Sequence, residues 1–243
     1  MHLSNSNQFT IYSISEKAVS IEFGNKIEEK LMNRISNLNR LILENPFIGL
    51  DCTVPAYTTL TLFFNPIKVI SDKSLIGKSC FDKVSNYLSK IAQENDDSTD
   101  KVKTIINIPV CYDEHFGLDL KELSIYHQLP KEKIIQLHSS VIYTVFMIGF
   151  VPGFAYLGGM PEVLTSPRKL APRKAIPAGS VGIAGQQTGI YPLETPGGWQ
   201  IIGKTPLKLF DVNRTQPSLL KAGDSIKFYP INLSDFQSCN EYL

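Results

Sequence analysis

The sequence has little net charge, few cysteines and no long uninterrupted run of apolar residues. Its 243 residues carry a formal charge of +1, with 10 basic and 12 acidic residues up to position 100 and 14 and 11 beyond it. Neither half has the excess of positive charge that attracts nucleic acid or an anionic membrane, so we expect neither partner. No segment approaches the roughly 18 apolar residues of a membrane helix, and the N-terminus MHLSNSNQF lacks a leader pattern, which favours a cytoplasmic location.

The small number of cysteines also limits the metal sites and disulfide bonds that the chain can form. The four lie far apart and show no CxxC spacing: Cys52, Cys80, Cys111 and Cys239. Zinc sites and disulfide frameworks both need closer or more numerous cysteines. We therefore expect free thiols and no protein metal site.

The first hundred residues have the patterns of a small sheet covered by two helices. Residues 9–14, 19–23, 48–54 and 58–64 are rich in β-prone side chains. Between them and after them, apolar residues recur at helical spacing, as Ile27, Leu31, Ile35, Leu38 and Ile42, and again as Ile76, Cys80, Val84, Leu88 and Ile91. The second stripe predicts a helix over about 72–93. This order resembles a βαββαβ unit, so we predict an α+β domain.

The segment ENDDSTDK, residues 94–101, contains no apolar side chain and is typical of an interdomain linker. We predict two domains, residues 1–97 and 98–243. In the second, we expect a strand in KTIINIPV, helices near 119–129 and 131–139, and a buried strand over 141–148.

Glycine and proline then become frequent. Eleven of the 16 glycines and seven of the 15 prolines lie between Gly149 and Gly203, among short β-prone pieces. Further strands are expected in PLKLF and SIKFYP. Many short strands with tight corners are typical of a closed or nearly closed β-barrel, which we predict here.

The stretch GFVPGFAYLGGM, residues 149–160, is apolar and offers no acid, base or nucleophile. Between Gly149 and Gly203 the only acids are Glu162 and Glu194, and the cations gather in one segment, as Arg168, Lys169, Arg173 and Lys174. An apolar surface beside a basic cluster suits a small anion or a carboxylate with a hydrophobic body. The alternative is that the aromatic residues only fill the core and rim of the barrel.

The basic cluster is framed by prolines in PRKLAPRKAIPAGSVG, residues 167–182. Prolines at this spacing exclude a helix and favour a rigid extended loop that holds Arg168 and Arg173. The alternative for either arginine is ordinary surface solvation.

GWQIIGKT, residues 198–205, satisfies the phosphate-loop pattern GxxxxGK[ST]. That loop needs a strand before it and a helix after it, whereas Pro206 and the alternating residues that follow predict another strand. We interpret the match as a coincidence.

Three blocks, GFVPGFAYLGG, SPRKLAPRKAIPAGSVGIAGQQTGIYP and TPGGWQIIGKTPLKLFD, resemble the family that comprises allophanate hydrolase subunit 1, the 5-oxoprolinase B subunit, or KipI-type sensor-kinase inhibitors. The resemblance implies a cyclophilin-like C-terminal barrel. It also implies a chain that, with a homologous C subunit, and with a third, A subunit, hydrolyses 5-oxo-L-proline to L-glutamate at the expense of ATP with Mg²⁺. Alternatives within the resemblance are an inhibitor of a sporulation histidine kinase and a component of a biotin-dependent urea or allophanate carboxyltransferase. Prolyl isomerase activity is a further alternative, which rests only on the likeness of the expected barrel to cyclophilin.

The same resemblance marks candidate site residues. It implies a proton-transferring role for His138 and charge neutralisation by Arg168 and Arg173. His138 could instead cap a helix, and Trp199 could be a core residue. The candidate pocket residues are Pro152, Gly153, Phe154, Tyr156, Ser180, Gln187, Tyr191, Gly197, Gly198 and Trp199.

Overall fold

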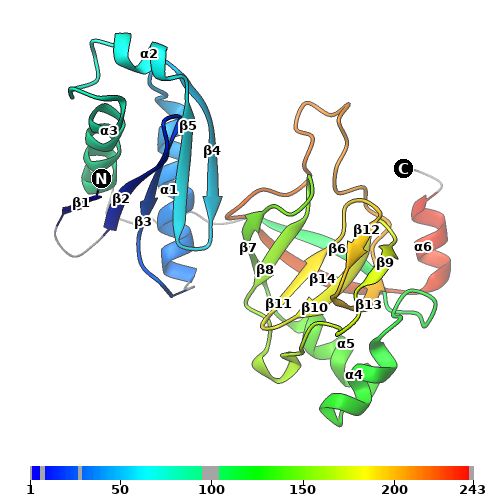
Figure 1. The fold of residues 1–243 in the computed structure, drawn as a ribbon. Coiled ribbons are helices and arrows are strands. Elements are labelled where there is room, and N and C mark those ends of the chain that lie inside the picture. The colour runs from blue at the N-terminus through cyan, green and yellow to red at the C-terminus, as the bar shows by residue number, and fades with distance from the viewer. Residues whose placement is uncertain (1, 6–8, 27–28, 95–103, 241–243) are drawn as a thin grey trace. The chain divides into compact units, whose positions relative to one another are not determined.

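A computed structural model of the chain describes residues 2–5, 9–26, 29–94 and 104–240 (Figure 1). The chain divides into two compact units, residues 1–101 and 102–243. The predicted boundary between residues 97 and 98, and residues 95–101 of the proposed linker, lie outside the described residues.

The first unit is a five-stranded antiparallel sheet with helices packed on it (Figure 1). Its strand order is β1-β2-β3-β5-β4, and the strands are β1 (His2–Asn5), β2 (Phe9–Ser15), β3 (Ala18–Glu22), β4 (Leu50–Ala56) and β5 (Thr59–Phe64). The helices are α1 (Glu29–Glu44), α2 (Pro66–Ser71) and α3 (Cys80–Glu94). Alternate residues of β2, β3 and β5, such as Ile11, Ile21 and Leu62, share one apolar core with α1 and α3.

The element order differs in detail from the predicted βαββαβ unit. Three strands precede α1, and the strand after α3 belongs to the second unit, where it pairs with barrel strands. Of the predicted α1 stripe, Ile35, Leu38 and Ile42 are buried, and Ile27 lies outside the described residues.

The second predicted helix begins later than expected. Gly77 has a φ of 152°, and a Cβ there would lie 2.6 Å from the backbone nitrogen of Lys83, so the chain turns at this glycine. A capping box then starts α3, because the Ser79 hydroxyl accepts from the Asp82 N–H at 3.1 Å and Asp82 accepts from the Ser79 N–H at 3.0 Å. Ile76 is left outside the helix and 80% exposed.

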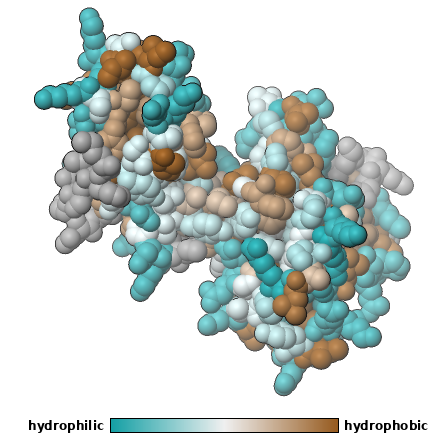
Figure 2. All heavy atoms as spheres, in the orientation of Figure 1, coloured by the Kyte–Doolittle hydropathy of each residue, from teal (hydrophilic) through white to brown (hydrophobic). Residues whose placement is uncertain are grey.

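Ile67 and Ile70 of α2 are exposed as well. Figure 2 shows hydrophobic surface at the end of the first unit where α2 lies.

The second unit is built on a closed seven-stranded barrel, as predicted. Its order is β10-β11-β8-β7-β14-β6-β13, and pairing of β13 with β10 closes it. The barrel strands are β6 (Ile105–Cys111), β7 (Tyr143–Ile148), β8 (Ala155–Gly158), β10 (Ser180–Ala184), β11 (Gln187–Ile190), β13 (Gln200–Lys204) and β14 (Ser225–Ile231). Only the β6–β14 pair is parallel among the described pairings.

The remaining elements surround the barrel (Figure 1). The helices are α4 (Leu120–His127), α5 (Lys131–Ser140), α6 (Leu233–Asn240) and a 3-10 turn, η1 (Glu162–Leu164). A separate two-stranded ribbon consists of β9 (Arg173–Ile176) and β12 (Thr195–Gly197). The two predicted helices and the predicted strand over 141–148 are confirmed within a few residues as α4, α5 and β7.

Two sequence interpretations concern the stretch around β13. Residues 200–204 of the phosphate-loop match form β13, and a Cβ on Gly203 would lie 2.8 Å from Val110, so this stretch is a packed barrel strand rather than an open loop. The strand predicted over 206–210 is wrong. The Leu207 N–H donates to the Thr205 hydroxyl at 3.3 Å, so the chain turns there, and only a single bridge from Phe210 to Ser218 forms.

Candidate functional site

A pocket of about 200 Å³ lies on the second unit, and half of the residues that line it are aromatic. We call it the aromatic pocket. It is lined by Phe150, Phe154, Tyr156, Arg168, Pro172, Tyr191, Pro196, Gly197, Gly198 and Trp199. Seven of these residues are candidates from the sequence analysis. Phe150, Pro172 and Pro196 were not among them, although all three lie in or beside the three family blocks.

Phe154 is the centre of the aromatic wall. Its ring is perpendicular to those of Tyr191 and Trp199, with centroids 5.0 and 5.4 Å away, and tilted against Tyr156 at 4.7 Å. Edge-to-face contacts of this kind stabilise a fixed arrangement of rings. Phe154, Tyr191 and Trp199 are buried in an apolar cluster separate from the main barrel core, so the floor of the pocket is rigid.

Two glycines make room for these rings. A Cβ on Gly189 would lie 2.9 Å from the indole of Trp199 and 2.9 Å from the carbonyl oxygen of Ala155. A Cβ on Gly197 would lie 2.4 Å from the hydroxyl of Tyr191. Any side chain at either position would displace an aromatic wall, so these glycines serve close packing around the pocket.

Phe150 forms the outer wall. It follows β7 in the left-handed conformation, with φ 69°, and its ring meets Phe154 edge-on at 5.7 Å. The side chain is nevertheless 60% exposed. A bulky residue rarely adopts this backbone conformation, and such outliers gather at binding sites.

Tyr191 contributes a polar atom to the apolar wall. Burial raises its pKa to about 12, with a smaller opposing effect of the Trp199 backbone N–H that hydrogen-bonds to it. The phenol therefore keeps its proton at neutral pH and can donate a hydrogen bond.

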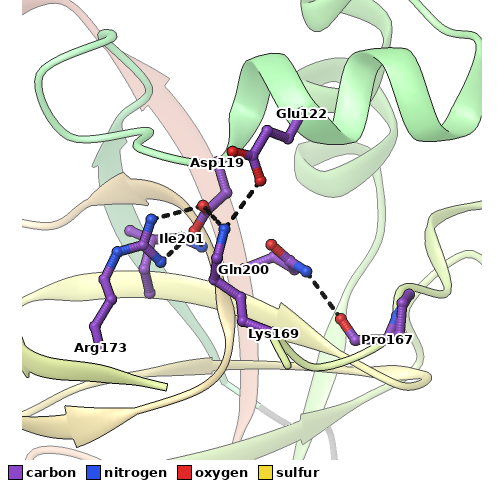
Figure 3. Close-up of polar contacts among 7 residues, drawn as sticks. All are labelled: Asp119, Glu122, Pro167, Lys169, Arg173, Gln200 and Ile201. Atoms are coloured by element: carbon purple, nitrogen blue, oxygen red, sulfur yellow. Dashed lines mark hydrogen bonds and ion pairs between the residues drawn. The ribbon is translucent and has the colours of Figure 1, made fainter. Parts of the chain in front are cut away.

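Arg168 is the cation of the pocket. Its neighbours are held in place. The Lys169 N–H donates to the Gly198 carbonyl at 2.7 Å. The Gln200 amide donates to the Pro167 carbonyl at 3.0 Å (Figure 3). Among the described residues, no hydrogen bond or ion pair joins Arg168 to a carboxylate. The pocket thus presents a guanidinium beside aromatic rings, an arrangement that suits an anion.

Arg173 does not line the pocket. Its guanidinium donates two hydrogen bonds of 2.7 Å to the two oxygens of Asp119, in the bidentate geometry typical of arginine (Figure 3). Lys169 donates to the same carboxylate at 2.6 Å and to Glu122 at 2.9 Å. The family resemblance implies the same role for Arg168 and Arg173, neutralisation of a bound charge, but the structure separates them, because Asp119 holds Arg173 outside the pocket.

Asp119 was not a candidate from the sequence. Its side chain is fully buried and also accepts from the Ile201 N–H at 2.6 Å. Burial raises its pKa, but hydrogen bonds from Arg173, Lys169 and Ile201 outweigh burial and hold the pKa below its ordinary value. Its partners lie about fifty or more positions away in the sequence, so no local pattern identifies it.

His138 lies in the barrel core rather than in the pocket lining. The ring is stacked on Phe228 at 4.6 Å and is fully buried, which lowers its pKa to about 3. The Thr188 hydroxyl donates to the Gly182 carbonyl, so it accepts from His138 Nε2, and Nδ1 accepts from Tyr112. With both nitrogens engaged and the ring neutral, this position does not suit proton exchange with a ligand in the pocket.

The other candidates lie outside the lining of the pocket. Pro152 and Gly153 are in the turn from β7 to β8, where Gly153 has a φ of 84° and packs against Phe210. Ser180 is buried and donates to the Pro177 carbonyl at 2.7 Å. Gln187 begins β11, beside the tight turn from β10.

The sequence matches the carboxyltransferase domain family, subdomains C and D, over residues 9–220. A relative from Bacillus subtilis, named as the B subunit of 5-oxoprolinase, is 41% identical over 96% of this chain and 98% of its own length. The chain belongs to the 5-oxoprolinase B-subunit family. The resemblance seen in the three sequence blocks is thereby confirmed.

Solved structures place this B-subunit fold within longer proteins. The chain covers 40% of one solved protein, at 32% identity and a TM-score of 0.76. It covers 16% of the urea amidolyase of K. lactis, at 17% identity and a TM-score of 0.72, a likeness of fold alone. Within the described residues, no helix is long and apolar enough to cross a membrane.

Proposed function

We propose that this chain is the B subunit of an ATP-dependent 5-oxoprolinase and that the aromatic pocket binds 5-oxo-L-proline. The observation that carries the proposal is Arg168, whose guanidinium lines an aromatic recess without a carboxylate partner among the described residues. Sequence identities of 41% and 36% to relatives that are named as B subunits of 5-oxoprolinase also support it.

The dimensions of the pocket favour a compact ligand. Its volume of about 200 Å³ is below the roughly 300–1,000 Å³ of pockets that hold drug-sized molecules. 5-Oxoproline is a single five-membered lactam with one carboxylate. The flat faces of such a ring pack against Phe154 and Trp199, and the carboxylate pairs with Arg168.

The lactam also needs a polar contact, because its amide would otherwise lose hydrogen bonds on leaving water. Tyr191 stays protonated at neutral pH and supplies an O–H donor in the wall of the pocket. We infer that it donates to the lactam carbonyl. The role is positioning and polarisation of the carbonyl, since a protonated phenol is no base.

Within the described residues, neither the phosphate-loop match nor the aromatic pocket suits ATP with Mg²⁺. The phosphate-loop match is strand β13, the described residues hold no cluster of three or more histidine, cysteine or carboxylate groups, and the aromatic pocket is too small for a nucleotide beside a lactam. We therefore infer that two further subunits, the homologous C subunit together with the third, A subunit, bind ATP with Mg²⁺ and supply the groups for hydrolysis. This chain then binds and orients the lactam.

Steady-state kinetics of the assembled complex test the proposal. Arg168→Gln should raise the KM for 5-oxoproline about tenfold or more, because one charge-assisted hydrogen-bonded pair is lost, and leave the KM for ATP unchanged. Lys174→Gln removes an equal charge from an exposed lysine that does not line the pocket and serves as the control. An unchanged KM for 5-oxoproline in Arg168→Gln would contradict the assignment, as would ATPase activity that is independent of 5-oxoproline.

Two exposed apolar side chains favour one alternative. Phe150 of the pocket is 60% exposed, and Leu170, two residues after Arg168, is completely exposed; exposed apolar side chains are frequent in protein interfaces. In this alternative the chain is an inhibitor that binds a histidine kinase through these side chains. Inhibition of the autophosphorylation of the purified kinase, lost in Leu170→Ser, would support it, and no inhibition at micromolar concentrations would exclude it.

A further inference from the structure

One carboxylate joins two of the chain segments that line the aromatic pocket. The first is the basic segment, residues 167–174, which carries Arg168. The second is the stretch 197–201, which carries Trp199. Asp119, at the start of α4, bonds to both, through Lys169 and Arg173 of the first and through the Ile201 N–H of the second (Figure 3).

The basic segment is fixed on either side of Arg168. Pro167 is held through its carbonyl by Gln200, and Lys169 is held through its N–H by Gly198 and through its ammonium by Asp119. Arg168 lies between these two fixed positions. It lines the pocket, whereas the Lys169 side chain is bound to Asp119.

Asp119 also binds two cations of the basic segment that do not line the pocket. The basic segment has four cations, and its two partly buried ones, Lys169 and Arg173, are both bound to this carboxylate. A buried carboxylate in a bidentate pair with arginine has a fixed geometry, because planar groups leave one arrangement for two parallel hydrogen bonds. The pairing removes these cations from competition with Arg168 for an incoming anion.

We propose that Asp119 is a positioning residue for the aromatic pocket, which fixes the basic segment against residues 197–201 and thereby directs Arg168 alone to the bound anion. The name of that anion, 5-oxoproline, rests on the proposed function. The positioning itself rests on the contacts of Asp119.

The test uses a variant that removes the ion pair without changing the net charge, Asp119→Asn combined with Arg173→Gln. Its matched control is Glu122→Gln, because Glu122 binds the same lysine but its side chain is 70% exposed and contacts neither Arg173 nor Ile201. Trp199 is the only tryptophan of the chain, so its fluorescence reports on the pocket in the full-length protein. Circular dichroism selects conditions in which every variant is folded.

Titration with 5-oxoproline gives the first readout. The double variant should bind it about tenfold more weakly, because the guanidinium of Arg168 no longer has one fixed position, and Glu122→Gln should bind as the wild type does. If Asp119 serves stability alone, the double variant melts at a lower temperature but binds 5-oxoproline with wild-type affinity when folded. That result would overturn the proposal.

Quenching of Trp199 gives a readout that does not depend on the ligand. Arg168 should concentrate iodide near the indole, so the ratio of quenching by iodide to quenching by neutral acrylamide should fall about twofold in Arg168→Gln and equally in the double variant. If the ratio falls in both variants but the wild type does not bind 5-oxoproline, the proposed function is wrong and the positioning role is still supported. An unchanged ratio in the folded double variant overturns the positioning role, whatever the ligand is.

Arg173→Lys covers the case in which the double variant does not fold. It keeps the charge but replaces the planar fork by a single ammonium, which cannot bond to both oxygens of Asp119 in parallel. A several-fold loss of 5-oxoproline affinity or a lower iodide ratio supports the proposal. Wild-type values of both overturn it.

Discussion

At the scale of single residues, Phe150 lines the pocket and has an unfavourable backbone conformation. The left-handed region costs a residue with a Cβ roughly 1–2 kcal/mol, and the exposed ring recovers little of this by burial. Phe150→Gly should therefore leave the free energy of unfolding unchanged or raise it by about 1 kcal/mol, while 5-oxoproline binding weakens because the outer wall is lost. Urea denaturation and calorimetry measure the two quantities. A variant that is less stable but binds normally would show that Phe150 is a packing residue only.

The buried His138 makes stability depend on pH. Burial lowers the pKa of its imidazole to about 3, whereas the unfolded chain binds this proton near pH 6.5. The unfolded state therefore binds more protons as the pH falls from 6.5 toward 3, so stability decreases over that range, by about 2 kcal/mol between pH 6.5 and 5.

His138→Gln should remove this dependence and flatten the difference in melting temperature between pH 7 and pH 5. Burial lowers the pKa of His127 too, but that residue is present in both proteins and cancels in the comparison. Equal differences in the wild type and the variant would mean that His138 does not stay neutral in the folded protein.

At the scale of elements, the capping box that begins α3 should carry measurable stability. Ser79→Ala removes the acceptor of the Asp82 N–H and should lower the free energy of unfolding by about 1 kcal/mol. Ser85→Ala on the same helix is the matched comparison. Its buried hydroxyl has no hydrogen-bond partner in the part of the chain that the structure describes, so its removal should be neutral or stabilising. Chemical denaturation of both variants checks this, and equal losses of stability would show that the cap is not formed.

Some of the helices and strands could be predicted from the sequence, and others could not. The helices α4 and α5 and the continuous apolar strand β7 could be predicted within a few residues. The start of α3 was missed because the stripe through Ile76 continued past Gly77, where the backbone turns. The strand expected over 206–210 failed because a local turn at Thr205 competes with pairing.

The residues of the candidate site also differ in whether the sequence could predict them. The rings of the pocket lie in blocks that the family resemblance marks, so Phe154, Tyr191 and Trp199 could be chosen from the sequence. The separation of Arg168 from Arg173 could not, because it depends on a buried carboxylate brought in from α4. The spacing of a basic segment shows which cations are neighbours in the sequence. It does not show which of them pair with a carboxylate from another element.

At the scale of the whole molecule, each of the two units has a main core of its own. One lies between the five-stranded sheet and its helices, and the other fills the closed barrel. The pocket belongs wholly to the barrel unit, between strands β8, β11 and β13 and the β9–β12 ribbon. The proposed ligand recognition therefore belongs to the second unit, in a family whose name refers to one component of a larger enzyme.

The central claim is that Arg168 binds the carboxylate of a small lactam in the aromatic pocket. Its most direct test is the titration of Trp199 fluorescence with 5-oxoproline and with 2-pyrrolidinone, which has the same ring without the carboxylate. The account predicts that Arg168→Gln weakens 5-oxoproline binding tenfold or more and leaves the weaker binding of 2-pyrrolidinone unchanged. Equal affinities of the wild type and Arg168→Gln for 5-oxoproline would contradict it.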